Sequence, residues 1–299
     1  MTLSICGSKT NKYSKELVNH GSALFPVACY DDDLSQIDVT WHWHGEWEAL
    51  VITHGSAVIA VGSEKYKLRQ DEGFFINTEV LHAAWEFQSA GCRLHSVVFH
   101  PRLVGGSMDS VFWQGYIQPL LQDDQLKCVH LDGSAFWHQE MISSIEAAWQ
   151  HGVAEEDGYE FEVRSSLSRM TALLKQNQTS LHSPPSEKEL RDNRRLKIML
   201  QYIQEHYMEE LSISQIAQSA MISESECLRN FRSTIGTAPI QYVKQFRMQQ
   251  AIQLLMTTKK KVGDIGAECG FVDTSYFIKA FRELKGCTPG EYRQQGRGI

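Results

Sequence analysis

The last third of the chain repeats one helical plan, and this repeat restricts the fold more than any other feature. The plan is a short apolar helix, a tight break and a second helix that opens on a side chain able to cap its free amides. It covers 211–217 with 223–235, and again 262–270 with 273–284. Ser223 and Asp273 are the capping residues, and Glu226 completes a capping-box pattern. A plain helical bundle is the simpler alternative, but two copies favour a pair of helix-turn-helix units.

A connecting helix is predicted between the two units, at Pro239–Thr257. Proline suits the first turn of a helix, where its missing N–H has no partner to lose. About 18 residues span about 27 Å at 1.5 Å per residue. Successive major-groove faces of a duplex lie roughly 34 Å apart. The connector therefore has a suitable length to hold the two second helices against one duplex.

Charge is divided unevenly along the chain. Residues 188–299 hold 17 Lys and Arg against 12 Asp and Glu, a net charge of +5, whereas residues 1–187 have a net charge of −12. A basic segment binds polyanions because neutralised phosphates release condensed counterions. The two halves are therefore expected to serve different purposes.

A polar stretch at 177–187, interrupted by Pro184-Pro185, separates the halves and is expected to be a semi-stiff linker. We predict one domain at 1–176 and another at 188–299. Residues 24–100 contain short runs rich in Val, Ile, Phe and Trp between turn signals, a pattern typical of a small β-barrel or sandwich. Apolar residues then recur at helical spacing over about 135–150 and 157–176.

Four polar side chains in the strand-rich half form a candidate ligand set. His42 and His44 alternate along one strand and so face the same side, with Glu48 close behind and His82 after a later strand. Three imidazoles and a carboxylate suit a divalent transition metal. A metal-free effector pocket and purely structural histidines are the alternatives.

Tryptophans cluster near the same segment, where aromatic rings can stack on sugars and other flat molecules. Trp85 is the candidate effector contact among them. Trp41, Trp43 and Trp47 have the strand parity opposite to His42, so the alternative is that they pack the barrel against its helices.

The second helical unit carries an extended motif. Residues 264–282 read DIGAECGFVDTSYFIKAFR, and residues 286–293 read GCTPGEYR. This closely resembles the signature of AraC-family transcription regulators, and the first unit matches it through Phe231-Arg232 and Gly236–Pro239. The resemblance covers about residues 195–294. Gly266, Cys227 and Cys269 depart from the usual residues, but all are small or apolar and should soften the packing without changing the fold.

This resemblance implies that the second helix of each unit enters the DNA major groove. The base-facing positions are then Ser225, Leu228 and Arg229 in the first unit and Thr274, Ser275, Ile278 and Lys279 in the second. Arginine forks onto guanine, Ser and Thr bond several base edges, and Leu or Ile contacts the thymine methyl. Arg232 and Arg282 are expected at phosphates, which position a protein without reading sequence. A solvated helix face is the alternative for each residue.

Residues 42–55 are similar to the first motif of the cupin fold, H-x-H, three residues, E, six residues, G, which is complete through Gly55. The second motif is incomplete, since Thr78 stands where proline is usual. The resemblances imply an α+β chain: an N-terminal cupin-like β-barrel with flanking helices, then an all-α domain with two helix-turn-helix units joined by a helix. The effector-binding residues would be His42, His44, Glu48, His82 and Trp85.

Together these features predict a sequence-specific transcription regulator controlled by a small molecule, with a saccharide as one option. The implied partners are promoter DNA, a second copy through the helices after the cupin domain, and RNA polymerase if the protein is an activator, the commoner habit of the family. No cofactor is required, and a divalent metal is an option. The rival prediction is a metal-dependent cupin enzyme, an oxygenase or isomerase, with a helical accessory domain. A third is a sensor that acts through protein partners.

The seven scattered cysteines include no CxxC pair, which argues against a disulfide framework. No apolar run reaches the roughly 18 residues of a membrane span. The first residues lack the basic start and apolar stretch of a secretory signal. We therefore expect a cytoplasmic protein with no membrane partner.

Overall fold

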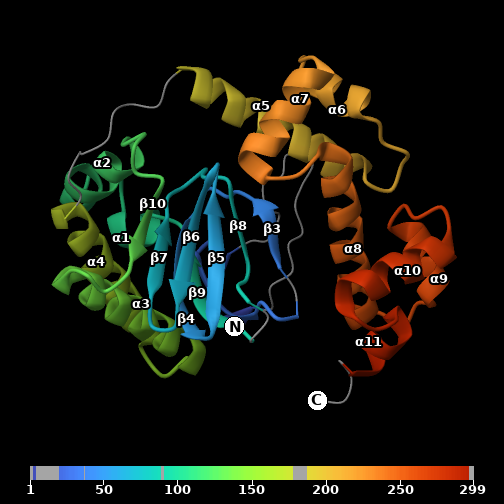
Figure 1. Cartoon of the computed structure of the whole chain (residues 1–299). Coiled ribbons are helices and arrows are strands. Elements are labelled where there is room, and N and C mark those ends of the chain that lie inside the picture. The colour runs from blue at the N-terminus through green and yellow to red at the C-terminus, as the bar shows by residue number, and fades with distance from the viewer. Residues whose placement is uncertain (1–2, 5–19, 37, 89–90, 178–186, 296–299) are drawn as a thin grey trace. The chain divides into compact units, whose positions relative to one another are not determined.

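The computed structural model describes residues 3–4, 20–36, 38–88, 91–177 and 187–295. They form two compact units, and the division between them along the chain falls between Leu190 and Arg191. Unit 1 combines two β-sheets with helices, and unit 2 is helical (Figure 1). This is the predicted α+β class. The predicted linker falls almost wholly on 178–186, outside the described residues, so the domain limits at 176 and 188 stay predictions.

Unit 1 is built on two sheets. The larger has the strand order β1 (Leu3–Ser4), β2 (Val27–Asp33), β9 (Arg93–Phe99), β4 (Trp47–His54), β7 (Gly73–Ile76) and β10 (Cys128–Leu131). The smaller has the order β3 (Val39–His42), β8 (His82–Glu86), β5 (Ser56–Val61) and β6 (Glu64–Arg69). Paired strands are antiparallel except β1 with β2, which are parallel.

The predicted barrel is not closed. Within the described residues, no strand pairing joins the two sheets; β3 is an edge strand that pairs only with β8, and its register shifts between Val39 and His42. The sheets instead enclose an apolar core, with Leu50 from the larger sheet and Ile59 and Leu68 from the smaller. Side-chain packing, rather than a continuous backbone ladder, therefore holds them together.

Strand β4 separates two cores. Trp47 and Ala49 join the core beneath the helices, whereas Leu50 and Ile52 join the core between the sheets. Because alternate residues of a strand face opposite ways, Glu48 lies on the inter-sheet side with Leu50. Trp47 thus packs the sheet against its helices, as the strand parity indicated.

The helices of unit 1 all come after β9 in the chain, and β10 lies between α2 and α3. They are α1 (Arg102–Gly105), a π-helix η1 (Trp113–Ile117), α2 (Gln118–Leu121), α3 (Phe136–Ala154) and α4 (Tyr159–Asn177). The last two confirm the helices predicted at 135–150 and 157–176, and they lie beside the larger sheet (Figure 1). Ile145 and Leu167 are fully buried there, but Phe136 and Phe161 are 78% and 77% exposed.

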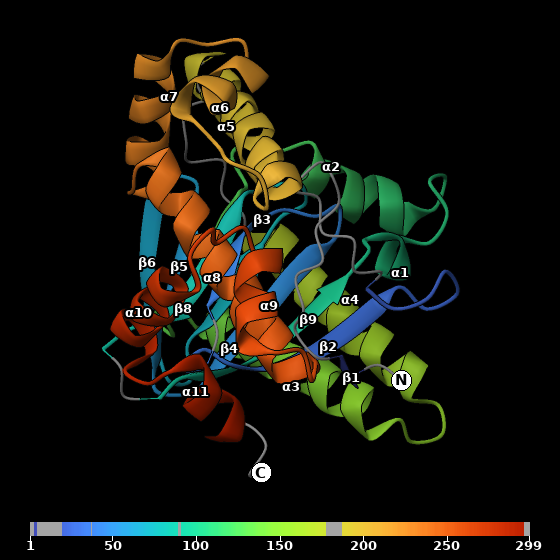
Figure 2. The ribbon, with the colours of Figure 1, turned by 90° about the vertical axis from the view of Figure 1, so that its right-hand side faces the viewer.

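The helices of unit 2 contain both predicted helix-turn-helix units. They are α5 (Glu187–His206), α6 (Ile213–Ser219), α7 (Glu224–Asn230), a π-helix η2 (Phe231–Ile235), α8 (Pro239–Thr257), α9 (Val262–Glu268), α10 (Thr274–Lys285) and α11 (Pro289–Gln295). In Figure 1 and Figure 2, α8 lies between the α6–α7 pair and the α9–α10 pair. Among the helices described, none has both the length and the hydropathy of a membrane span.

The turn of each unit passes through one residue in the left-handed region. These residues are Met221, with φ of 53°, and Gly270, with φ of 79°. Met221 is 90% exposed, so its side chain meets no obstacle. A Cβ on Gly270 would lie 2.5 Å from the carbonyl oxygen of Tyr207 and 2.9 Å from the Cα of Met208. The backbone of Tyr207 and Met208 therefore restricts the second turn to glycine.

We expect Gly270→Ala to lower the free energy of unfolding by about 1–3 kcal/mol, because it adds left-handed strain and a clash with backbone atoms. Met221→Gly is the matched control and should change that free energy by less than about 1 kcal/mol. Chemical denaturation followed by circular dichroism measures both. Wild-type stability in Gly270→Ala would contradict the restriction.

Candidate functional site

The second helix of each helix-turn-helix unit is fixed at its first turn by the predicted cap. The Ser223 hydroxyl accepts a hydrogen bond from the N–H of Glu226, and the Glu226 carboxylate accepts one from the N–H of Ser223, each 3.2 Å long. The bond from the Ser223 backbone, followed by that from its hydroxyl, lowers the pKa of Glu226. In α10, Asp273 Oδ1 accepts from the N–H groups of Ser275 and Tyr276 at 2.6 and 3.2 Å. Both capping predictions are confirmed.

The structure brings the predicted DNA-contacting residues to the surface of these helices. The exposed members are Ser225, Arg229 and Arg232 in the first unit and Thr274, Ser275, Lys279 and Arg282 in the second. Leu228 and Ile278 are half-buried. On the opposite side of the helices, Phe231 and Phe281 are fully buried. The apolar side is therefore anchored, and the polar and basic side is available to a partner.

One surface depression gathers most of the second set. Its lining is Ser275, Ile278, Lys279, Arg282, Glu283 and Thr288. The sequence analysis missed Glu283 and Thr288. Glu283 could have been found, because it stands one helical turn after Lys279. Thr288 lies in the segment before α11, so only the fold places it here.

Two basic side chains of unit 2 are held by the protein itself. Arg247 donates from Nε to the carbonyl of Tyr207 and from Nη2 to the carbonyl of Glu209, both at 2.6 Å. Lys260 Nζ lies 2.7 Å from a carboxylate oxygen of Glu268. These bonds hold the Arg247 guanidinium and the Lys260 ammonium against the protein itself.

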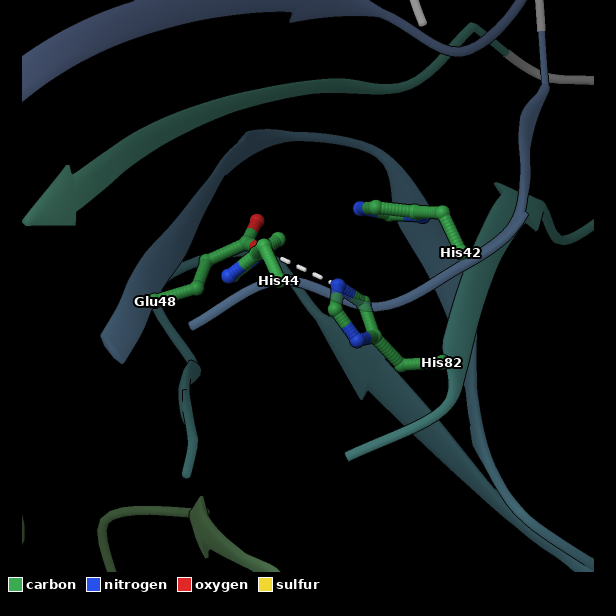
Figure 3. Close-up of side chains that lie close together, drawn as sticks. All are labelled: His42, His44, Glu48 and His82. Carbon is green, nitrogen blue, oxygen red and sulfur yellow. Dashed lines mark hydrogen bonds and ion pairs between the residues drawn. The ribbon is translucent and has the colours of Figure 1, made fainter. Parts of the chain in front are cut away.

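Unit 1 assembles the predicted ligand set of His42, His44, Glu48 and His82. Their ligand atoms all lie within 4.8 Å of one another, and the side chains point toward a common centre (Figure 3). β3 and β8 of the smaller sheet supply His42 and His82, while β4 of the larger sheet supplies Glu48. The histidines are buried, and Glu48 is 13% exposed. The cluster thus bridges the two sheets that backbone pairing leaves apart.

Backbone carbonyls set the protonation of each ring. The Nδ1–H groups donate to a carbonyl two residues away: His42 to Thr40 at 2.8 Å, His44 to Glu46 at 3.1 Å and His82 to Val80 at 2.8 Å. A carbonyl oxygen only accepts, so Nδ1 carries the proton. Nε2 is then the nitrogen with an available lone pair. Metal-ligating histidines in proteins are commonly oriented in this way.

Glu48 places a carboxylate against two of these nitrogens. Its Oε2 lies 3.3 Å from His44 Nε2 and 3.0 Å from His82 Nε2. Burial alone raises the pKa of Glu48, but the hydrogen bonds and charges of the two histidines outweigh it and hold that pKa well below its ordinary value. A carboxylate oxygen and a lone pair on Nε2 repel each other unless positive charge lies between them, either as ring protons or as a cation. The donor set therefore fits a divalent metal ion.

A further histidine, which is not part of the sequence motif, lies next to the cluster. His20 is buried, its Nδ1 lies 2.8 Å from the Tyr30 hydroxyl, and its ring centroid is 5.3 Å from that of His44. It precedes the motif in the sequence, where no periodic pattern marks it. Folding alone brings it to the site.

Trp85, the predicted effector contact, does not join the cluster. It alternates along β8 with Ala84, which lies in the core between the sheets, so the indole faces the opposite side. Lys65 Nζ lies 5.3 Å from its ring centroid. Strand alternation therefore separates Trp85 from His82, and its role as an effector contact stays a prediction.

Two family models match the chain, a helix-turn-helix domain over residues 216–295 and an AraC-like ligand binding domain over residues 24–131. The chain belongs to the AraC family of transcriptional regulators. The two matches fall on unit 2 and unit 1 respectively. Each contains the candidate site described above for that unit.

Known AraC-family proteins resemble this chain over nearly its whole length. The HTH-type transcriptional regulator YdeC of Bacillus subtilis is 29% identical, with 94% of this chain and 96% of YdeC covered. The HTH-type transcriptional activator RhaS of Escherichia coli is 24% identical, with 94% and 99% covered. A crystal structure of an AraC-type regulator from Chromobacterium violaceum covers 35% of this chain and 93% of its own, at 31% identity and a TM-score of 0.34. This AraC-family chain is thus a transcription regulator with a ligand-binding and a DNA-binding domain.

We expect Ser223→Ala to lower the free energy of unfolding by about 1 kcal/mol, because the first turn of α7 loses its capping oxygen. Ser233→Ala is the control, since the Ser233 hydroxyl bonds only to the exposed carbonyl of Asn230 among the contacts described. Urea denaturation of both variants gives the comparison. Equal stabilities would show that the cap contributes nothing.

Proposed function

We propose that this AraC-family regulator is an activator that reads promoter DNA through α7 and α10 and responds to a small molecule bound in unit 1. One observation carries the proposal: both helices are capped at the N-terminus, anchored by a buried phenylalanine and exposed along a polar and basic face. Similarity to the activator RhaS supports the sign of regulation and, with it, RNA polymerase as a partner.

The exposed side chains divide into two roles. Arg229 and Lys279 donate to guanine O6 and N7, while the serines and Thr274 bond base edges and Leu228 and Ile278 contact thymine methyls. Arg232 and Arg282, one turn further along, hold phosphates. The half-burial of Leu228 and Ile278 suits short apolar contacts rather than long polar ones.

We expect Arg229→Ala to weaken specific DNA binding by about 1–3 kcal/mol, because a fork onto guanine is lost. Arg69→Ala, which removes an exposed arginine of β6 in unit 1, controls for net charge. Gel-shift titrations at several salt concentrations measure both, and affinity should fall steeply with salt. Unchanged affinity and base preference in Arg229→Ala would remove this residue from the reading surface.

We propose that the His42, His44, Glu48 and His82 cluster holds a divalent transition metal and forms part of the effector site. A bound cation would supply a positive centre for oxygen or nitrogen donors of the effector. The residues themselves hold the donor atoms in place through the backbone carbonyls behind the rings. The saccharide option loses its support from Trp47 and Trp85, neither of which faces the cluster.

We expect Zn²⁺ or Mn²⁺ to raise the thermal midpoint of the wild-type protein, because binding only to the folded state adds about 2.7 kcal/mol at a hundredfold excess over Kd. The double variant His42→Ala/His44→Ala should not respond. His54→Ala, which removes an exposed histidine of β4, should respond like wild type. Equal shifts in all three proteins would place the metal elsewhere.

The second candidate is a metal-dependent cupin enzyme, an oxygenase or isomerase, and the complete four-residue cluster is the observation that favours it. Both candidates place a metal at this cluster, so sequence-specific DNA binding is what distinguishes them. Metal-loaded protein that shows no base preference in gel-shift titrations would favour the enzyme candidate. The similarity of the whole chain to transcription regulators favours the regulator.

The regulator proposal includes a homodimer through α3 and α4 and a cytoplasmic location, where promoter DNA lies. The exposed Phe136 and Phe161 on these helices support a protein contact, since large apolar side chains at a surface often mark one. An effector controls such a protein only by binding one arrangement of it better than another.

A further inference from the structure

The outward faces of α10 and of the continuous segment formed by α7 and η2 carry one chemical pattern at equal sequence spacing. The pattern, counted from the capping residue, is serine at two (Ser225, Ser275), an aliphatic at five (Leu228, Ile278), a cation at six (Arg229, Lys279) and arginine at nine (Arg232, Arg282). The four positions follow i, i+3, i+4 and i+7 spacing, which places them on one side of a helix.

Both helices are seated in the same way, so the pattern is presented alike. Phe231 and Phe281 stand eight residues after their caps and are fully buried. Each helical segment ends at a left-handed glycine, Gly236 with φ of 81° and Gly286 with φ of 72°. A proline then opens the next helix in both units. The two helical segments are therefore equivalent from the capping residue to the glycine at the end and the proline that follows it.

Residues beside the pattern differ between the helices. The residue directly after the cap is Glu224 in the first unit and Thr274 in the second. The residue ten positions after the cap is Ser233 in the first unit and Glu283 in the second. Charge and size change at these flanking positions, whereas they are kept at the four face positions. The likeness thus belongs to the outward face and does not simply reflect a uniform repeat of sequence.

We infer that each chain reads two near-copies of one short base motif, about one helical turn apart. The inference rests on the proposed function, that these faces contact bases. Equal side chains at equal positions select equal bases: a guanine opposite the cation, and a thymine methyl beside the aliphatic residue. The copies differ in strictness, because the planar fork of Arg229 recognises guanine in a fixed geometry and the Lys279 ammonium does not.

The test is selection of bound duplexes from a random library by the full chain at one fixed salt concentration. The wild type should enrich two like boxes with centres about 10–10.5 base pairs apart. Lys279→Arg should raise the guanine preference about tenfold in one box only, and Arg229→Lys should lower it by a similar factor in the other. Arg69→Lys, an exposed change on β6 of unit 1, should enrich the wild-type sequence.

The outcomes separate the two proposals. Enrichment of two unlike boxes, or an effect of both variants on the same box, would overturn the inference while leaving DNA reading intact. Absence of any enriched sequence, with equal affinity for all duplexes, would instead overturn the proposed function. Two like boxes at the expected spacing, with a stronger guanine preference in one box of Lys279→Arg, would support both the inference and the proposed function.

Discussion

The rotation of each recognition helix is fixed by the aromatic side chain that it buries, and the DNA-facing surface depends on this packing. Phe231 and Phe281 are fully buried, and Phe277 fills the space beside Gly266 so closely that a Cβ there would lie 2.8 Å from its ring. A close-packed interior leaves such a helix no alternative rotation. The Phe277 ring thus fills the space that the methyl group of the family's usual Ala would take at position 266.

In unit 1 the comparable constraint is electrostatic. Two sheets with no shared backbone ladder among the described residues bring three imidazoles and one carboxylate into a buried cluster. In His44 and His82, backbone carbonyls fix the ring protons on the outer nitrogens, so the inner nitrogens confront Glu48. This arrangement is stable only with added positive charge, which links the ligand chemistry of the domain to the cohesion of its sheets.

Local features could be predicted from the sequence, and long-range ones could not. The caps at Ser223 and Asp273 and the limits of α8 depend on neighbours a few residues apart, and the structure reproduces them. The four-residue ligand set also followed from spacing and parity. Whether the barrel closes depends on which distant strands pair. The position of His20 beside His44 depends on the tertiary fold, which brings together residues far apart in the sequence. Trp85 lies apart from the cluster because it has the opposite parity to His82 on β8.

The clamp of Arg247 on the two carbonyls beyond α5 has a mechanical consequence. Any tilt of α8 must break two short charged hydrogen bonds, so the connector resists bending. In the proposed DNA complex, a stiff rod of about 27 Å would fix the separation of the two recognition helices against the roughly 34 Å repeat of straight B-form DNA. Curvature of the double helix would then take up the difference, and base steps that yield easily between the contacted grooves would contribute to affinity although no side chain touches them.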